Sequence, residues 1–196
     1  MARGARFSFI CMFVVIEGCD GTGKTTLAAA LAKRLADKDP LCIRFPDRST
    51  LTGQTIDAYL RGETPGMTAE TIHLLMSANR WERASAITEA LIADRPVICD
   101  RYSYSGAAYS SAKGLELAWC LAADRGLPEP SLILYLDTSQ PRMSGDEIYE
   151  RTAFQKRVRA AYHIVRKRDE RWVTLNADLS RDELLEAALS AIEKHA

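Results

Sequence analysis

A glycine-rich segment near the N-terminus constrains this chain more than any other feature. Gly18-Cys-Asp-Gly-Thr-Gly-Lys-Thr25 follows the pattern GxxxxGK[ST]; an apolar run ends just before it at Glu17, and a helix pattern begins at Thr25. A strand, a glycine-rich turn and a helix in this order make a loop whose backbone N–H groups surround a phosphate. The segment therefore predicts a nucleotide-binding loop, with ATP as its ligand.

The residues of this loop are expected to divide the binding of ATP between them. The glycines let successive N–H groups turn toward a phosphate, and the following helix adds the positive end of its dipole. Lys24 places a cation near the β- and γ-phosphates, and the hydroxyl of Thr25 is placed for Mg²⁺. The predicted ATP-binding residues are Gly18, Gly21, Thr22, Gly23, Lys24, Thr25 and Thr26.

Short β-branched runs alternate with helix patterns along the whole chain. Runs that are apolar on both faces are typical of central strands in a parallel sheet. The predicted strands are Phe9–Glu17, Leu41–Phe45, Val97–Asp100, Leu132–Asp137 and Trp172–Asn176. The predicted helices are Thr25–Asp37, Thr52–Arg61, Ala69–Ala93, Leu115–Ala123, Tyr149–Arg168 and Arg181–Lys194. The alternation predicts a doubly wound α/β fold with a five-stranded parallel sheet, whose ligands bind beyond the carboxyl ends of the strands.

Length and composition favour one globular domain that spans residues 1–196. Hydrophobic residues make up 47% of the chain, and 26 Lys and Arg balance 26 Asp and Glu. Bulk nucleic-acid binding needs a basic surplus, so we expect no nucleic-acid partner. We expect no membrane span either, and the apolar start is interpreted as a strand rather than a signal peptide. These features predict a cytoplasmic protein, with a nuclear or organellar fraction as the alternative.

A carboxylate that assists a bound magnesium ion should end a strand beside the loop. Asp100 ends one predicted strand and Asp137 ends another. Asp100 is followed directly by Arg101, so an acid and a phosphate-binding cation emerge together at one strand end. We therefore assign Thr25 and Asp100 to the metal, since Asp137 can instead cap the next helix or loop.

Residues suited to a second substrate follow the second strand and lie on the third predicted helix. Pro46 disfavours helix at the residue before it, which places Arg48 at the carboxyl edge of the sheet, where a guanidinium can bind phosphate oxygens in pairs. Met76 and Arg80 are four residues apart and share a helix face. An apolar contact beside an Arg donor suits nucleobase recognition, although Met76 on its own is more often core packing.

Four further segments, in order around the glycine-rich loop, give the chain a family resemblance. They are Phe45-Pro-Asp-Arg-Ser-Thr50, Leu74-Leu-Met-Ser-Ala-Asn-Arg-Trp-Glu82, Asp100-Arg-Tyr-Ser-Tyr-Ser-Gly106 and Gly126-Leu-Pro-Glu-Pro130. With them the chain resembles thymidylate kinases, particularly the eukaryotic branch, from about Phe13 to the C-terminal helix. The resemblance implies phosphorylation of thymidine monophosphate (dTMP) to the diphosphate for dTTP biosynthesis, with ATP as donor, Mg²⁺ as cofactor and a homodimeric assembly.

The resemblance also implies roles for residues of the acceptor site. Arg48 and Arg101 would hold the acceptor phosphate, and Arg80 would donate to thymine O4, where cytosine carries an amino donor instead. Asp20 would bind the sugar 3′-hydroxyl, and Tyr149 would pack on the deoxyribose and exclude a 2′-hydroxyl. The other acceptor-site residues would be Phe45, Met76, Ser105, Gly106 and Tyr109.

The chain departs from the family pattern at two positions. Met76 stands where the family usually has Phe, which weakens stacking on the base. Gly21 stands where animal relatives tend to have Arg, so the catalytic cation must come from elsewhere, as in the bacterial pattern. The predicted lid, about residues 138–148, has Arg142 as its basic residue, and Arg151 and Lys156 on the following helix are the alternates. The predicted catalytic residues are Lys24, Asp100, Arg101 and Arg142.

Three other functions fit parts of the sequence. A deoxynucleoside kinase acting on free thymidine would share the phosphate loop and an Arg-bearing lid, but Arg48 and Arg101 favour an acceptor that already carries a phosphate. A switch GTPase would need an Asn-Lys-x-Asp motif, which the sequence lacks. An inactive homologue would explain Met76, Gly21 and a short lid, yet the sequence keeps Lys24, Thr25, Asp100 and Arg101.

Overall fold

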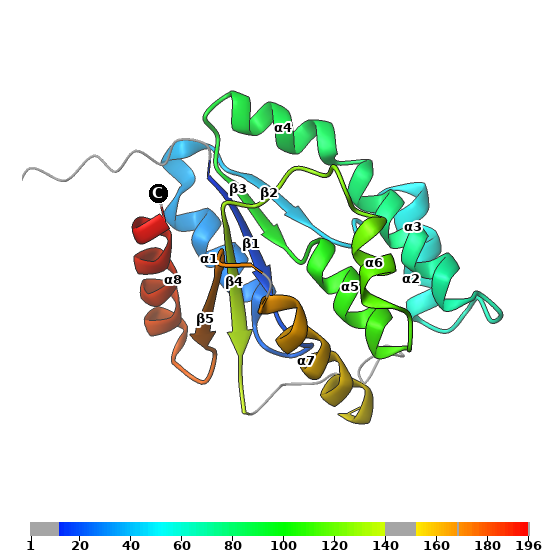
Figure 1. Cartoon of the computed structure of the whole chain (residues 1–196). Helices are drawn as coiled ribbons and strands as arrows, with labels where there is room; N and C mark the ends of the chain where they lie inside the picture. The colour runs from blue at the N-terminus through cyan, green and yellow to red at the C-terminus, as the bar shows by residue number, and fades with distance from the viewer. Residues whose placement is uncertain (1–11, 140–151, 168, 196) are drawn as a thin grey trace, which may run out of the picture.

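The computed structural model describes residues 12–139, 152–167 and 169–195, which form a parallel sheet with helices on both faces (Figure 1). The described strands are β1 (Phe13–Glu17), β2 (Leu41–Arg44), β3 (Val97–Asp100), β4 (Leu132–Asp137) and β5 (Trp172–Asn176). Their order is β2-β3-β1-β4-β5, and neighbouring strands are parallel. The predicted doubly wound five-stranded fold is confirmed. Residues 9–11 of the first predicted strand lie outside the described part.

The central position of β1 fixes where the functional residues emerge. Val14 pairs with Ile98 of β3 on one side and with Leu132 of β4 on the other. Every residue of β1 is buried, as expected for a strand covered on both faces. The segments that follow β1, β3 and β4 therefore leave the sheet side by side at its carboxyl edge, where ligands bind in such folds.

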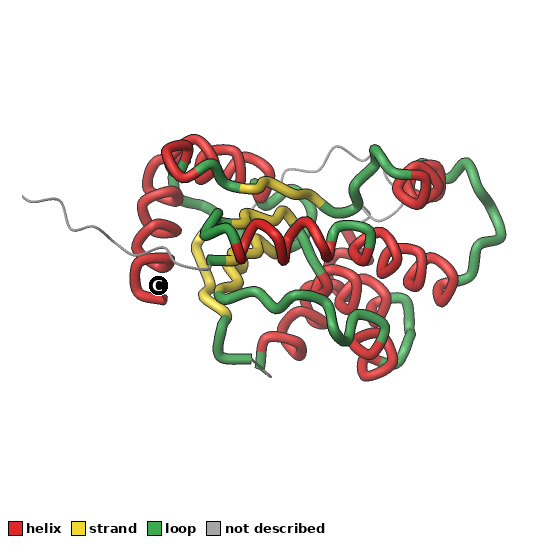
Figure 2. Tube along the Cα trace, turned by 90° about the horizontal axis from the view of Figure 1, so that it is seen from above, coloured by secondary structure: helices red, strands yellow, loops and turns green. Residues whose placement is uncertain are grey.

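Two layers of helices cover the sheet, as the view from above shows (Figure 2). On one face, α1 (Lys24–Arg34) and α8 (Arg181–His195) pack through Leu31, Ala188 and Ile192. The other face is covered by α4 (Ala84–Ile92), α5 (Ser103–Ala112) and α7 (Thr152–Arg166). The remaining helices are α2 (Leu51–Leu60), α3 (Ala69–Trp81), α6 (Leu117–Ala122) and the 3₁₀ turn η1 (Ala36–Lys38). Ile56, Leu60 and Ile72 join α2 to α3 in a smaller core beside the sheet.

The single long helix predicted over Ala69–Ala93 is wrong, because the structure divides it into α3 and α4. The break follows Trp81, where the Arg83 N–H bonds the Arg80 carbonyl three residues back instead of four. The Arg83 guanidinium also pairs with Asp47, in the segment after β2. The break between α3 and α4 is thus accompanied by a contact with a distant segment. No Gly or Pro near the break indicates it in the sequence.

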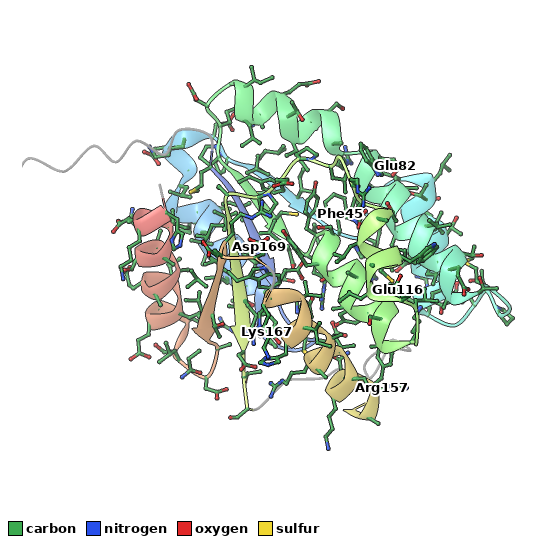
Figure 3. The ribbon with its side chains drawn as sticks, viewed as in Figure 1. Phe45, Glu82, Glu116, Arg157, Lys167 and Asp169 are labelled. Atoms are coloured by element: carbon green, nitrogen blue, oxygen red, sulfur yellow. The ribbon has the colours of Figure 1, made fainter. Side chains whose placement is uncertain are left out.

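Helix α5 is absent from the predicted elements. Its sequence, SYSGAAYSSA, is rich in small and polar residues and has no apolar stripe to give a helical period. No side chain at its own N-terminus caps it. By contrast, the predicted helix near Leu115 is found as α6, with Glu116 at its start (Figure 3). Both carboxylate oxygens of Glu116 accept N–H groups, from Ala118 and Trp119 at 3.0 Å.

The remaining predicted helices are found with ends that differ from the prediction by at most three residues, and α8 begins at Arg181 as predicted. Residues 149–151 and 168 of the helix predicted over Tyr149–Arg168 lie outside the described part. Within the described residues, no helix combines the length and the apolar character that a membrane span requires.

Candidate active site

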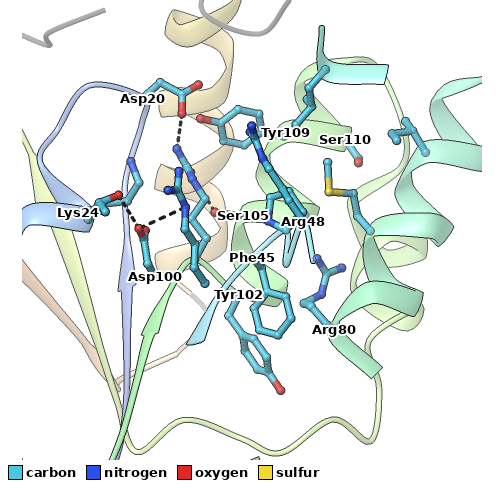
Figure 4. Close-up of a pocket in the computed structure, with 18 of the residues that line it drawn as sticks. Asp20, Lys24, Phe45, Arg48, Arg80, Asp100, Tyr102, Ser105, Tyr109 and Ser110 are labelled. Atoms are coloured by element: carbon cyan, nitrogen blue, oxygen red, sulfur yellow. Dashed lines mark hydrogen bonds and ion pairs between the residues drawn. The ribbon is translucent and has the colours of Figure 1, made fainter. Parts of the chain in front are cut away.

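A cavity of about 440 Å³ opens at the carboxyl edge of the sheet and joins the glycine-rich loop to α2, α3 and α5 (Figure 4). Asp20, Lys24 and Asp100 lie on one side of it, and Arg80 and Ser110 lie on the other. Most of the predicted site residues line this one cavity: Asp20, Gly21, Gly23, Lys24, Thr25, Thr26, Phe45, Arg48, Met76, Arg80, Asp100, Arg101, Ser105, Gly106 and Tyr109.

The loop after β1 has the geometry of a phosphate cradle. A side chain at Gly18 would place its Cβ 2.7 Å from the Leu136 carbonyl oxygen, so only glycine lets the loop lie this close to β4. Helix α1 begins at Lys24, and no side chain caps its N-terminus. Its first N–H groups therefore remain available to an anion, as the sequence predicts.

Lys24 lies buried inside this cradle. Its ammonium donates to the Cys19 carbonyl and to the Thr22 hydroxyl, which in turn donates to the same carbonyl at 3.0 Å. Burial, with the nearby charge of Arg101, lowers the pKa of Lys24 to about 7 although Asp20 and Asp100 oppose the shift. A bound polyphosphate would supply the negative charge that stabilises the protonated ammonium.

The hydroxyl of Thr25 donates to Asp100 Oδ2 at 2.6 Å, which joins α1 to the end of β3. Asp137, the alternative carboxylate, instead pairs with Arg159 of α7 at 3.1 Å. Two hard oxygen donors beside the cradle suit Mg²⁺, which binds through few protein ligands and the phosphates of its nucleotide. The fit needs no larger cluster, and the described residues contain no group of three His, Cys, Asp or Glu side chains suited to a metal.

Arg101 is held in a strained backbone conformation beside the loop. Its φ is +70°, a left-handed value that non-glycine residues adopt only under constraint. Its guanidinium donates to the Gly18 carbonyl at 3.0 Å and to Ser105 Oγ at 3.1 Å, and pairs with Asp20. It also lies over the ring of Tyr109, 5.2 Å from the centroid. The strained backbone therefore belongs to a residue whose cation is held by several contacts.

Asp20 is the partner of Arg101 and stays ionised in this setting. Burial alone would raise its pKa, but the charges of Arg101 and Lys24 hold that pKa below its ordinary value. Gln155 of α7 binds Asp20 twice: its amide donates to Oδ2 at 2.6 Å, and its carbonyl accepts the Asp20 N–H at 3.1 Å. Gln155 is a site residue that sequence reasoning missed.

Glu17 is a second residue that the sequence did not reveal. Its buried carboxylate accepts the N–H groups of Tyr102 and Ser105 at 2.9 and 3.1 Å, so it caps α5 from a distant strand. It also accepts the hydroxyls of Ser105 and Tyr162, the latter at 2.8 Å. Because Ser105 contacts Arg101, Glu17 links the start of the loop to the placement of this arginine.

Arg80 lies at the far end of the cavity as one half of a buried ion pair. Its Nε and Nη2 donate to the two oxygens of Asp124 at 3.0 and 2.7 Å, and both side chains are at most 5% exposed. Ser77 donates to the same carboxylate at 2.7 Å. A Cβ at Gly106 would lie 2.8 Å from Arg80 Nη2, so a side chain there would force the guanidinium to move. Asp124 was also missed, because no motif links it to Arg80.

The other predicted acceptor residues occupy the side of the cavity nearest β2. Phe45 is buried against the ring of Tyr102, with centroids 5.7 Å apart. Arg48 pairs with Asp57 of α2 at 2.7 Å while lining the cavity, and Met76 joins the core of α2 and α3 at the cavity wall. Met76 therefore packs against this core and also lines the cavity, while its contact with a nucleobase stays a prediction.

Four predicted residues do not line the cavity or lie outside the described part. Gly18 and Thr22 are buried within the glycine-rich loop and do not line the cavity. Arg142 and Tyr149 fall outside the described residues, as does most of the predicted lid after Ser139. Several cavity residues lie outside the motifs found in the sequence: Arg44, Leu60, Ile72, His73, Ser110 and Lys113.

Comparison with known proteins agrees with this geometry. A family model described as thymidylate kinase matches residues 16–188. The chain is 40% identical over 181 residues to a thymidylate kinase of Dictyostelium discoideum, covering 88% of this chain and 81% of that protein. It is 44% identical over 178 residues to one of Arabidopsis thaliana, covering 87% of this chain and 66% of that protein.

Solved structures give the same result. A thymidylate kinase from Candida albicans superposes with a TM-score of 0.86 at 32% identity, over 94% of this chain and 93% of that one. One from Ehrlichia chaffeensis, at 23% identity, has a TM-score of 0.76 over 92% of this chain and 98% of that one, and supports the fold. By the family model, the relatives and the fold together, the chain belongs to the thymidylate kinase family.

Proposed function

We propose that this chain transfers the γ-phosphoryl group of ATP to dTMP, giving ADP and thymidine diphosphate for dTTP biosynthesis. One observation carries the proposal: a single cavity joins the ATP loop to two arginines suited to an acceptor phosphate, Arg48 and Arg101, and to a base-facing donor, Arg80. Incubation with ATP, Mg²⁺ and dTMP should yield ADP and thymidine diphosphate in equal amounts by chromatography. Hydrolysis of ATP without a phosphorylated acceptor would contradict the proposal.

The reaction requires alignment and charge neutralisation rather than covalent catalysis. An oxygen of the dTMP phosphate bonds to the γ-phosphorus while the bond from that phosphorus to the ADP oxygen breaks. Lys24 and Arg101 would share the charge of the transferring group, and Arg48 would hold the acceptor phosphate. Thr25 and Asp100 would hold Mg²⁺, which offsets the charge of the ATP phosphates when it is bound.

The residues of the acceptor site support a nucleotide rather than a nucleoside as the acceptor. A kinase of free thymidine has no acceptor phosphate to bind, and the comparisons do not favour that alternative. Asp20 faces the cavity as an ionised acceptor and would bind the sugar 3′-hydroxyl. Tyr149 would pack on the deoxyribose as its counterpart.

Arg142 is proposed as the catalytic arginine of the lid, since the loop has Gly21 where animal relatives tend to have Arg. Arg142→Ala should lower kcat about 100-fold with little change in the Kd of dTMP, because a cation on the transferring group acts mainly in the transition state. Single-turnover kinetics and equilibrium dTMP binding separate the two effects. Near wild-type turnover would remove Arg142 from the mechanism, and Arg151→Ala would then test the alternate.

Met76 is proposed to contact the face of the thymine ring. Met76→Phe should lower the KM for dTMP about threefold, because an aromatic ring stacks on a base better than a thioether does. The KM for ATP, bound at the other end of the cavity, is the internal control. An unchanged KM for dTMP would show that Met76 does not face the base.

We also propose a cytoplasmic homodimer. Leu74, Ala78 and Trp81 form an outward-facing stripe on α3, and Leu74 and Trp81 are 50% and 44% exposed. Trp119 of α6 is also partly exposed at 38%, and its ring lies 5.2 Å from that of His73 on α3. Apolar side chains gathered on two adjacent elements mark surfaces that a partner covers.

Leu74→Glu should convert the dimer to a monomer, because it places a charge in the apolar stripe. Sedimentation velocity would give twice the 21.8 kDa chain mass for the wild type and the single chain mass for the variant. Ile92→Glu is the matched control, since Ile92 is 79% exposed on α4, away from the stripe. A monomeric wild type would contradict the dimer proposal.

A further inference from the structure

Tyr162 of α7 carries a fully buried hydroxyl that the proposed mechanism does not use. This hydroxyl donates to Glu17 Oε2 at 2.8 Å and lies 2.8 Å from Ser105 Oγ. Tyr162 reaches these residues because α7 packs against α5, in a core that includes Val158 and Ala108 (Figure 1). Polar groups from β1, α5 and α7 thus meet in one buried cluster.

The carboxylate of Glu17 fixes the direction of both hydroxyl hydrogens in this cluster. Its Oε1 accepts the N–H groups of Tyr102 and Ser105, and its Oε2 accepts the hydroxyls of Ser105 and Tyr162. Burial raises the pKa of Glu17, but these hydrogen bonds and the charge of Arg101 oppose the shift and favour the ionised form. An ionised carboxylate has no hydrogen to donate, so both hydroxyls must point toward it.

The direction of its hydrogen makes Ser105 an acceptor toward Arg101. With the hydrogen committed to Glu17, Ser105 Oγ keeps lone pairs for the Arg101 guanidinium, which donates to it at 3.1 Å. If that hydrogen turned toward Arg101 instead, two donors would face each other and the hydrogen bond would be lost. The buried cluster therefore sets the polarity on which this contact depends.

Helix α7 also holds a second side-chain partner of Arg101. Gln155 donates to Asp20 Oδ2 at 2.6 Å, and Asp20 pairs with Arg101. Gln155 and Tyr162 are seven residues apart, so they lie on one face of α7. That face thus contacts two side chains that accept hydrogen bonds from the guanidinium, Asp20 and Ser105 (Figure 4).

We propose that Tyr162 and Glu17 are positioning residues, because they commit the hydroxyl of Ser105 to accept a hydrogen bond from the arginine of the acceptor site. The inference rests on the proposed function, in which this arginine, Arg101, binds the acceptor phosphate and shares the charge of the transferring group. A guanidinium that is already oriented loses less freedom when the phosphate binds, so a misplaced one weakens both binding and turnover.

Tyr162→Phe removes the hydroxyl and keeps the aromatic ring in the core. Because a hydrogen bond to a charged group is lost, kcat/KM for dTMP should fall about 10-fold, through a lower kcat and a higher KM for dTMP. The KM for ATP should not change, since the glycine-rich loop keeps its own contacts. Tyr104→Phe is the matched control: its hydroxyl donates to Asp169 at 3.0 Å, away from this cluster, so kcat/KM should stay at the wild-type value.

Glu17→Gln reverses the polarity at nearly constant shape. The two backbone N–H groups at Oε1 cannot become acceptors, so the amide oxygen must face them and the amide NH₂ must face the two hydroxyls. The Ser105 hydrogen is then directed toward Arg101, and kcat/KM for dTMP should fall about 100-fold. Urea unfolding checks that the variant is folded under the conditions of the assay.

A double-mutant cycle separates positioning from a general structural effect. In the Arg101→Ala background, Tyr162→Phe should cause no further loss of kcat/KM, because a residue that acts through Arg101 then has nothing left to position. A structural role would instead lower kcat/KM by the same factor in both backgrounds, and would raise the KM for ATP as well.

The same assays separate this inference from the proposed function. Equal losses in the two backgrounds, or wild-type kcat/KM in both Tyr162→Phe and Glu17→Gln, would overturn the inference while leaving dTMP phosphorylation intact. A wild type without activity on dTMP would overturn the proposed function and the inference together.

Discussion

Arg101→Ala should lower kcat/KM for dTMP about 1,000-fold, the largest effect expected from a single substitution in this site. The guanidinium bonds Gly18, Ser105 and Asp20 at once, so its loss removes a cation from the reacting phosphates and the partner of the Asp20 carboxylate. Steady-state kinetics with dTMP and ATP measure the effect. Both kcat and the KM for dTMP should change, because the residue would touch the ground-state phosphate as well as the transition state.

Arg101→Lys separates charge from geometry in this prediction. A lysine keeps the charge but lacks the planar fork that reaches several oxygens at once, so most of the activity should still be lost. Arg34→Ala is the matched control, because Arg34 is exposed at the end of α1 and away from the cavity. Wild-type kcat/KM in Arg101→Ala would show that the strained, multiply bonded arginine is a structural feature alone.

Asp124→Ala should lower the free energy of unfolding by about 3–5 kcal/mol, the range expected when one partner of a buried ion pair is removed. Arg80 would keep its charge with no counterion in a site where it is 2% exposed. The Arg80 guanidinium would also lose the two hydrogen bonds that hold its orientation. Because Arg80 is proposed to bind the thymine base, the KM for dTMP should rise. Urea unfolding gives the stability, and kinetics on the folded protein give the KM.

Asp124→Asn distinguishes the two consequences. The amide keeps one oxygen for the Arg80 fork but loses the negative charge, so a smaller rise in the KM for dTMP is expected than in Asp124→Ala. Asp37→Ala, at an exposed position in η1, is the control for loss of a carboxylate and should change neither stability nor KM. Unchanged stability in Asp124→Ala would contradict the role of the ion pair in holding α3 to the end of α6.

The sequence predicted the parts of this molecule that depend on local patterns. Three features can be recognised within one short stretch of sequence. They are the glycine-rich loop, the alternation of apolar runs with helix patterns, and the acids or arginines that follow the strands. These patterns place Lys24, Thr25 and Asp100 at one edge of the sheet, where the structure has Thr25 hydrogen-bonded to Asp100. Family resemblance then named the acceptor side, and Arg80 and Arg101 do line the same cavity.

The residues that orient this machinery could not be predicted in the same way. Glu17 caps a helix that begins 86 positions later at Ser103, Gln155 binds Asp20 from α7, and Asp124 pairs with Arg80. Each contact joins segments that only the tertiary fold brings together, so no periodicity or motif reports it. For the same reason the sequence did not predict α5, whose N-terminus is capped by Glu17 of β1. It also did not predict the break after α3, where Arg83 bonds Asp47 in the segment after β2.

The acceptor profile of the wild-type enzyme tests the central claim most directly. ADP release would be followed with ATP and Mg²⁺ and with dTMP, deoxyuridine monophosphate, deoxycytidine monophosphate, deoxyguanosine monophosphate and free thymidine in turn. The geometry predicts fast turnover with dTMP, slower turnover with deoxyuridine monophosphate and background rates with the others. Turnover of free thymidine at a rate equal to or above that of dTMP would contradict the account.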